Sequence, residues 1–452
     1  MRSINPADGR PFAEYANHDS AEVVRRLDAA GLAFDAWRRS TLEDRGARLR
    51  AVAARLRAER SLFARLMSLE MGKPIVQSEA EVDKCAWVCE HCAEHGAADL
   101  APLPAASDAT RSFVRFDPLG VVLAVMPWNF PLWQVFRCAA PALMAGNAVA
   151  LKHASNVPGC ALAIERVWLE SGLPPGVFTT LLVPAAEVAG LIDHPAVRAV
   201  SLTGSESAGI GVAAHAGAAL KKTVLELGGS DAFIVLADAD PVAAARAAVA
   251  ARVINNGQSC IAAKRFIVEE AVANAFEAEF TRRTAELRVG DPLDRATDVG
   301  PLARADLWDE LHDQVARSVA AGARLVTGGT PLPGPGFFYR PAVLTGVRPG
   351  MAAFDEETFG PLAALIRARD PDDALALANA SRFGLGASLW CGDPGRAEAL
   401  AARIEAGAVF VNGPVKSDPR LPFGGIKRSG YGRELSTFGI REFVNIKTVW
   451  VK

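Results

Sequence analysis

Hydrophobic and polar positions alternate with two different periods along the chain. From residue 19 to residue 100, apolar residues recur at three- and four-residue spacing, which predicts helices interrupted at Gly72-Lys73-Pro74. The segment Asp19-Ser20-Ala21-Glu22 has the capping pattern of a helix start. After a Pro-containing break, residues 112–116 alternate and residues 120–126 are continuously apolar. The chain is therefore predicted to change there from helices to strands.

Strands and helices are predicted to alternate from residue 131 to residue 321. This repetition is typical of mostly parallel sheets, so we expect an α/β fold with two such domains in close contact. The predicted strands are residues 148–151, 179–183, 199–202, 232–236 and 265–269, and the predicted helices are residues 161–171, 186–194, 241–255, 271–287 and 303–321. Residues 441–451 alternate again and predict a strand that pairs in its own chain or with a partner subunit.

Composition and charge narrow the classes of protein that fit this pattern. The chain has 452 residues, 50% of them hydrophobic and 22% charged, as in ordinary globular proteins. The net charge of −2 argues against a nucleic-acid partner. Seven cysteines form no even disulfide framework and fit a reducing compartment, and the longest apolar strand is too short to span a bilayer. We therefore expect a cytoplasmic protein without a membrane partner.

Three cysteines crowd together at Cys85, Cys89 and Cys92. Their spacing matches the loop with which radical S-adenosylmethionine enzymes bind an iron–sulfur cluster. The alternative is one face of a helix, because residues 78–95 contain no Gly or Pro and a buried free cysteine behaves as a small hydrophobe. A cluster needs a wrapping loop, so we favour packing and expect no metal site.

Four other patterns contain residues capable of catalysis or cofactor binding. Cys260 lies among small and polar residues in Asn255-Asn256-Gly257-Gln258-Ser259-Cys260, so it is either an exposed nucleophile or a structural thiol. Glu226 stands in an apolar run before two glycines, where burial would make it a general base, although it could cap a turn instead.

The other two patterns are a rigid aromatic turn and a glycine-containing turn. Asn129 lies between aromatics and prolines in Pro127-Trp128-Asn129-Phe130-Pro131, where its amide either stabilises an oxyanion or only shapes the turn. Thr203-Gly204-Ser205 with Gly209 follows a strand and precedes a helix, a setting that favours phosphate, but it is not the generic dinucleotide fingerprint.

In this order, the patterns resemble the aldehyde dehydrogenase superfamily. Lys152 and two later segments, Glu357-Thr358-Phe359-Gly360-Pro361 and Pro422-Phe423-Gly424-Gly425-Ile426-Lys427-Arg428-Ser429-Gly430, also match. The resemblance extends from Asn5-Pro6 to the final strand, which is essentially the whole chain. Within the superfamily, the chain is most similar to a short bacterial branch of the succinate-semialdehyde dehydrogenases.

The resemblance implies a covalent oxidation of an aldehyde. Cys260 would attack the aldehyde carbon, and Asn129 with the Cys260 backbone N–H would hold the oxyanion. After hydride transfer to the cofactor, Glu226 would activate the water that hydrolyses the thioester. Relatives that transfer the acyl group to coenzyme A typically lack this base. We therefore expect hydrolysis to a carboxylic acid, with succinate semialdehyde as the first candidate and glutarate semialdehyde or another small aldehyde as the alternative.

The resemblance also implies a nicotinamide cofactor, NAD or NADP. The implied cofactor-binding residues are Trp128, Lys152, Ser155, Gly204, Ser205, Leu227, Glu357 and Phe359. Ser155 stands where NAD-preferring relatives have a Glu, so a 2′-phosphate should be accepted. The turn after the second nucleotide strand, residues 183–187, lacks the Gly that many relatives have, which leaves the preferred dinucleotide open.

For the substrate, the resemblance implies that Arg137 binds the distal carboxylate, with a surface salt bridge as the alternative role. A second family arginine is missing, because Ile254 occupies its position. We expect Arg420 to replace it and Ser417 to add a hydrogen bond.

The resemblance further implies three structural parts. We expect residues 1–107 and 119–227 to form a cofactor-binding domain, and residues 228–427 to form a catalytic domain. Residues 108–118 and 436–452 should form a small β element that joins subunits into a homodimer or homotetramer. Besides the iron–sulfur alternative, a non-catalytic oligomer remains possible, but it would not need Cys260, Glu226 and Asn129 together.

Overall fold

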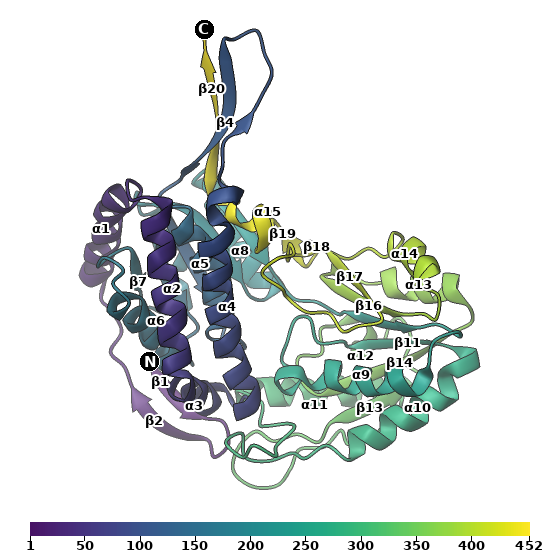
Figure 1. The fold of residues 1–452 in the computed structure, drawn as a ribbon. Coiled ribbons are helices and arrows are strands. Elements are labelled where there is room, and N and C mark those ends of the chain that lie inside the picture. Colours follow the sequence, from purple (N-terminus) through teal and green to yellow (C-terminus); the bar gives the residue numbers. More distant parts are fainter.

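The computed structural model describes residues 1–452 and has the predicted α/β architecture, with two large sheets side by side (Figure 1). The first sheet has six strands in the order β19-β9-β8-β5-β6-β7, all parallel except β19. These strands are β5 (Val121–Met126), β6 (Ala148–His153), β7 (Phe178–Thr180), β8 (Val197–Thr203), β9 (Lys222–Glu226) and β19 (Gly430–Tyr431).

Helices cover both faces of the first sheet because successive side chains of its strands point to opposite sides. Val122 and Ala124 of β5 join the hydrophobic core under α2 to α6, whereas Val121 and Leu123 join the core under α1, α7 and α8. These helices are α1 (Ser20–Trp37), α2 (Leu42–Ala58), α3 (Arg60–Met71), α4 (Ile75–Asp99), α5 (Trp133–Met144), α6 (Pro158–Glu170), α7 (Val188–Asp193) and α8 (Glu206–Ala218).

The second sheet has seven strands in the order β12-β13-β14-β11-β10-β16-β17, with only β12 antiparallel to its neighbour. These strands are β10 (Ala232–Val235), β11 (Arg265–Glu269), β12 (Arg324–Thr327), β13 (Ala342–Thr345), β14 (Leu362–Ala368), β16 (Gly386–Trp390) and β17 (Ala408–Val411). Its helices are α9 (Pro241–Val253), α10 (Glu270–Ala285), α11 (Ala305–Ala320), α12 (Ala352–Asp355), α13 (Pro371–Asn379) and α14 (Pro394–Ala401). The chain passes from one sheet to the other between Glu226 and Ala232.

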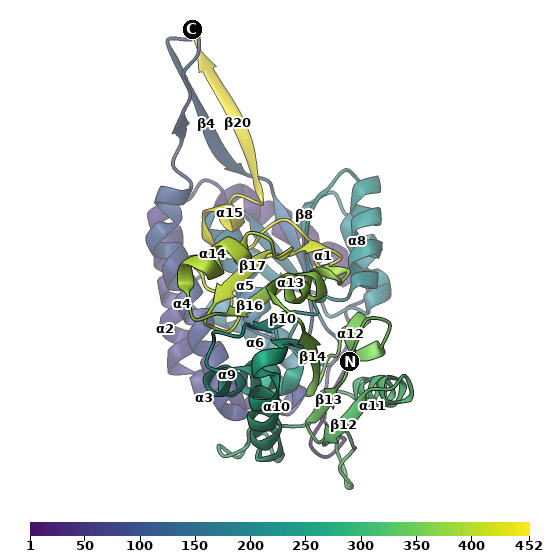
Figure 2. The ribbon, with the colours of Figure 1, turned by 90° about the vertical axis from the view of Figure 1, so that its right-hand side faces the viewer.

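A β extension projects from the body of the molecule (Figures 1 and 2). In it, β20 (Val444–Val451) pairs antiparallel with β4 (Arg111–Pro118) over its whole length, so the C-terminal strand pairs within its own chain. β3 (Leu103–Pro104) pairs with the other side of β4. We expected this element to begin at residue 108, but β3 belongs to the same sheet and lies before that residue.

The remaining elements are short. They are β1 (Arg2–Asn5) paired with β2 (Arg10–Glu14), β15 (Phe383–Gly384) paired with β18 (Ile426–Lys427), the 3-10 turns η1 (Ala185–Glu187) and η2 (Ile254–Gly257), and α15 (Ser436–Ile440). The helix expected over residues 186–194 is divided into η1 and α7. The helix expected over residues 241–255 ends at Val253. It stops there because Ile254 has an extended ψ of 126° and Asn255 has a positive φ of 52°.

The crowded cysteines lie on one continuous helix, as the packing interpretation requires. Cys85, Cys89 and Cys92 are buried on α4 in the core that this helix shares with α2 and α5. Burial raises the pKa of each thiol, that of Cys92 to about 12, so all three are held as neutral thiols. They act as core side chains.

No helix has both the length and the apolar character needed to cross a membrane.

Candidate active site

Cys260 lies where two cavities meet. One, here named the α4 cavity, has a volume of about 760 Å³ and is bounded by α4, α5, α9 and residues 415–417. The other, here named the α8 cleft, has a volume of about 780 Å³ and lies at the carboxyl edge of the first sheet beside the start of α8. Cys260 and Gln134 line both. A thiol in this position can face one ligand in each cavity, and both volumes are typical of small-molecule sites.

The loop that carries Cys260 has an unusual backbone. Asn255 and Asn256 have φ angles of 52° and 58°, and Gly257 follows with 75°. Asn and Gly tolerate this left-handed region better than other residues, which explains the sequence Asn-Asn-Gly. Asn255 Nδ2 then donates to the Gln258 carbonyl at 2.9 Å, and this hydrogen bond closes the turn before the cysteine.

A buried lysine fixes the other side of the same loop. Lys264 Nζ donates to the carbonyl oxygens of Ser259, Cys260 and Ala262 at 3.0, 2.8 and 3.3 Å. An ammonium group has three N–H donors, so all of them are used. Lys264 Nζ also lies 3.6 Å from Glu357 Oε1. Sequence reasoning missed Lys264, because an isolated lysine four residues after Cys260 carries no recognisable motif.

The Cys260 thiol is protonated at neutral pH in this arrangement. Burial raises its pKa to about 12, although the positive charges of Arg137 and Lys264 act in the opposite direction. Only a thiolate attacks a carbonyl carbon, so the thiol needs a base.

Glu226, at the end of β9, is a buried carboxyl group with base character. Burial raises its pKa well above the ordinary value, with Arg137 opposing the shift. Both of its carboxyl oxygens are buried and make no hydrogen bond in the protein. Once ionised, such a carboxylate is a stronger base than an exposed one. Glu226 therefore has the buried environment that the base hypothesis requires. It does not cap the turn that follows β9, because neither of its oxygens accepts a hydrogen bond.

Asn129 is bound to the loop that carries Cys260. Its Nδ2 donates to the Gln258 carbonyl at 3.1 Å, and its own carbonyl accepts from Asn255 Nδ2 at 2.6 Å. The side chain is buried and lines the α8 cleft, as Cys260 does. One N–H of the Asn129 amide is left for an oxygen in the cleft.

Most of the residues expected to bind the cofactor line the α8 cleft. Gly204 and Ser205 lie at the N-terminus of the 13-residue helix α8, which Ser205 caps through its hydroxyl. Helix N-termini favour phosphate. Leu227 adds an apolar wall, and the rings of Trp128 and Phe359 meet edge to face with centroids 5.7 Å apart.

Glu357 lies beside a glycine in the same cleft. Its Oε1 accepts from the Gly229 N–H at 3.0 Å, and a Cβ on Gly228 would collide with its Oε2. Gly228 therefore leaves room for this carboxylate.

Lys152 and Ser155 lie outside the residues that line the α8 cleft. Lys152 pairs in register with Val125 near the end of β6, so it is at the carboxyl edge from which Trp128 also emerges. Ser155 is exposed in the turn that follows. No carboxylate side chain occupies the short turn between Lys152 and Val157.

On the substrate side, Arg137 and Ser417 line the α4 cavity. Arg137, on α5, is buried, forms an ion pair with Glu434 and donates to Thr203 Oγ1 at 3.2 Å. Its guanidinium also lies 4.5 Å from the centre of the Phe423 ring. It is therefore not a surface residue, but its charge is compensated by a buried carboxylate.

Arg420 does not lie where we expected it. Its side chain is 65% exposed, its Nη2 binds Asp418 Oδ2 at 2.7 Å, and it does not line the α4 cavity. The ion pair with Asp418, two residues away, holds the Arg420 guanidinium outside this cavity. The cation that contacts Ser417 is instead Lys84 of α4, whose Nζ donates to Ser417 Oγ at 2.7 Å. Sequence reasoning missed Lys84 because it lies more than 300 residues from Ser417 and beside the conspicuous cysteines.

Known proteins are similar to this chain over its whole length. A probable NADP(+) succinate-semialdehyde dehydrogenase of Synechocystis is 51% identical over 451 residues, which are 100% of this chain and 99% of that protein. The NAD(P)+ succinate semialdehyde dehydrogenase Sad of Escherichia coli is 50% identical, over 99% of this chain and 97% of that protein. The succinic semialdehyde dehydrogenase of Streptococcus pyogenes, solved with NADP+, has a TM-score of 0.97 and 37% identity, and the match covers 100% of this chain and 99% of that one.

The family comparison agrees with these individual matches. Residues 1–449 match the model of the aldehyde dehydrogenase family, a range that contains Cys260, Glu226, Asn129 and every residue assigned above to either cavity. The chain therefore belongs to the aldehyde dehydrogenase family.

Proposed function

We propose that this protein oxidises succinate semialdehyde to succinate with NADP or NAD. The observation that carries the proposal is the position of Cys260 between two cavities, one suited to a dinucleotide and one containing cations. Relatives at about half identity over the whole chain are named for this substrate and for NADP(+) or NAD(P)+.

The residues of the α8 cleft fit a nicotinamide dinucleotide. The α8 N-terminus at Gly204 and Ser205 suits the pyrophosphate, Gly228 leaves the space in which Glu357 lies, and Trp128 and Phe359 supply flat apolar surfaces near Cys260. We propose that Lys152 and Ser155 face the adenosine ribose at the outer end. The absence of a carboxylate at Ser155 supports acceptance of a 2′-phosphate.

In the proposed mechanism, the Cys260 thiol loses its proton to water and its Sγ then bonds to the aldehyde carbon. The Asn129 amide and the Cys260 backbone N–H donate to the resulting oxyanion. A nicotinamide held by Trp128, Glu357 and Phe359 would supply the hydride acceptor for this carbon. Glu226 then takes a proton from water as the water attacks the thioester, the carbon–sulfur bond breaks, and the carboxylic acid is released.

We also propose that the β extension joins copies of this chain into a dimer or tetramer. Ile446 and Trp450 of β20 are 63% and 46% exposed on one face, and Phe438 of α15 is 66% exposed nearby in the sequence. Such apolar exposure on a projecting hairpin is typical of a protein contact surface. In this proposal the residues of both cavities come from a single chain.

The substrate proposal predicts a preference for aldehydes that carry a terminal carboxylate. We expect kcat/KM for succinate semialdehyde to exceed that for butanal by at least about tenfold, since one charge-assisted hydrogen bond contributes that much. The measurement compares succinate semialdehyde, glutarate semialdehyde, butanal and pentanal, each with NAD and NADP. Equal values for charged and uncharged aldehydes would contradict the proposal, and a higher value for glutarate semialdehyde would identify it as the substrate.

The base proposal predicts that Glu226→Gln separates the two halves of the reaction. The variant should release about one equivalent of reduced cofactor per active site in a rapid burst and then turn over about 10²- to 10⁴-fold more slowly than the wild type. Cys260→Ala should show neither burst nor turnover. Stopped-flow absorbance of the reduced nicotinamide measures both, and steady turnover at the wild-type rate in Glu226→Gln would exclude Glu226 as the base.

The cofactor proposal predicts that Gly228→Ala weakens dinucleotide binding. The new Cβ displaces the Glu357 carboxylate, so KM for NADP should rise by roughly tenfold with little change in KM for the aldehyde. Gly211→Ala is the matched control, because no atom lies within 4 Å of its added Cβ. An unchanged KM for NADP in Gly228→Ala would show that Glu357 does not position the cofactor.

The oligomer proposal predicts that a charge on the apolar face of β20 weakens association. Ile446→Asp should lower the molar mass measured by light scattering at micromolar concentration. Asn445→Asp, one residue earlier and on the opposite face of the strand, should leave it unchanged. A wild-type protein that is already monomeric would overturn the proposal.

A further inference from the structure

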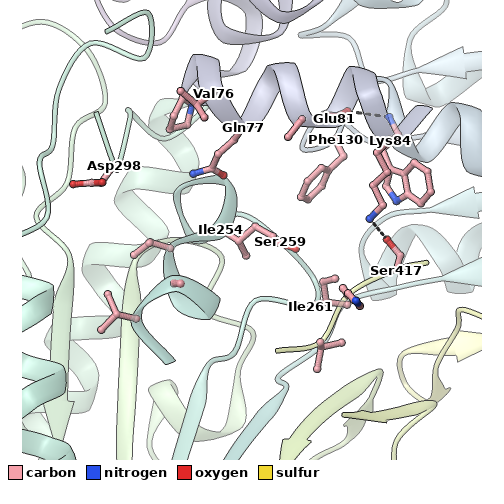
Figure 3. A pocket seen from close by; sticks show the side chains of 18 of the residues that line it. Val76, Gln77, Glu81, Lys84, Phe130, Ile254, Ser259, Ile261, Asp298 and Ser417 are labelled. Carbon is pink, nitrogen blue, oxygen red and sulfur yellow. Dashed lines mark hydrogen bonds between the residues drawn. The ribbon is translucent and has the colours of Figure 1, made fainter. Parts of the chain in front are cut away.

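Lys84 is the one cation of the α4 cavity that is half-buried and has no acidic partner, since Arg246 and Lys416, which also lack one, are exposed to solvent. Arg137, Arg283 and Arg295 also line this cavity, and each forms an ion pair, with Glu434, Glu279 and Glu79 respectively. Lys84 forms none within 4 Å. Its Nζ donates to Ser417 Oγ at 2.7 Å and lies 4.3 Å from the centre of the Trp133 ring. Figure 3 shows the Lys84 side chain extending from α4 toward Ser417.

The acidic groups nearest to Lys84 are already engaged. Glu81, one turn earlier on α4, accepts from the backbone N–H groups of Leu132 and Trp133 at 2.9 Å and forms an ion pair with Lys73. Asp418 is held by Arg420 at 2.7 Å. A half-buried ammonium without an anion is costly, so this site favours an anionic ligand.

We propose that Lys84, together with Ser417, binds the distal carboxylate of the aldehyde substrate and so determines the preference for semialdehydes. This inference rests on the proposed function and gives Lys84 the role expected for Arg420. A carboxylate has two oxygens, and Lys84 and Ser417 offer an ammonium and a hydroxyl that are already side by side. Trp133 and Phe130 line the same cavity and supply apolar surface for the methylene groups between the carboxylate and the aldehyde.

The electrostatics of the site agree with this role. Burial, together with the charge of Arg137 on α5, lowers the pKa of Lys84 to about 8. Cys85 and Glu81 on α4 and Asp418 on the loop after β17 act in the opposite direction, but too weakly. A bound carboxylate would offset the effect of burial and stabilise the charged form of Lys84. Arg137 also lowers the pKa of Cys260, so one guanidinium lies close enough to influence both ends of the cavity.

The test removes the Lys84 charge and keeps its length. Lys84→Met should lower kcat/KM for succinate semialdehyde by about 10- to 100-fold and leave that for butanal within about twofold. Lys84→Arg should retain most of the preference. Lys416→Met is the matched control, because Lys416 is a cation that lines the same cavity but is exposed to solvent, and it should change neither value strongly. Equal losses for both aldehydes in Lys84→Met would indicate a structural role and overturn the proposal.

The pH dependence gives a second readout that a structural role would not produce. The ammonium is present below the pKa of Lys84 and lost above it. The ratio of kcat/KM for succinate semialdehyde to that for butanal should therefore fall as the pH rises above about 8. The ratio cancels the titration of Cys260, which both substrates share. Lys84→Arg should keep the ratio constant to higher pH, and a constant ratio in the wild type would contradict the proposal.

Succinate itself separates this proposal from the proposed function. Inhibition of butanal oxidation by succinate and by butyrate measures carboxylate recognition without requiring turnover of a semialdehyde. If the wild type showed no preference for semialdehydes, the proposed function would fail, yet stronger inhibition by succinate that disappears in Lys84→Met would still support the Lys84 site. Equal inhibition of wild type and Lys84→Met by succinate would overturn the Lys84 site alone.

Discussion

The three hydrogen bonds from Lys264 to its own loop are the interaction on which the candidate active site depends. They hold the carbonyls of Ser259, Cys260 and Ala262 around one buried ammonium, and this fixes the backbone that carries the thiol. Because the same ammonium lies 3.6 Å from Glu357, the loop is also connected to the α8 cleft. A thiol on a loop without this restraint would not keep a constant position between two cavities.

Two different cavities meet at this thiol. The α8 cleft offers a helix N-terminus and small residues, whereas the α4 cavity contains cations, one of which is half-buried without an acidic partner. Arg137, which lines the α4 cavity, forms an ion pair with Glu434, and its charge also acts on the buried Glu226, whose oxygens make no hydrogen bond. Burial raises the pKa of both carboxyl groups, and Arg137 opposes the shift. This arrangement suits Glu226 for holding and releasing a proton.

Much of the fold and of the chemistry could be predicted from local patterns in the sequence. The strand over residues 265–269 has the predicted bounds, and Cys260, Asn129 and Gly204 were found because short motifs surround them. No helix or strand was predicted within residues 322–435, where most strands are short and separated by loops. The roles of Arg420 and Lys84 could not be predicted, since the direction of a side chain depends on partners such as Asp418 and Ser417 that packing brings near. Lys264 was missed for the same reason.

The central claim is that Cys260 becomes acylated by the substrate and that Glu226 is needed to release the acid. Mass spectrometry of Glu226→Gln, quenched after mixing with succinate semialdehyde and NADP, tests this claim most directly. The account predicts a mass increase of one succinyl group, located by peptide mapping on the segment that contains Cys260 and absent without NADP. An unmodified Cys260 under these conditions, or acylation of another cysteine such as Cys85, would contradict it.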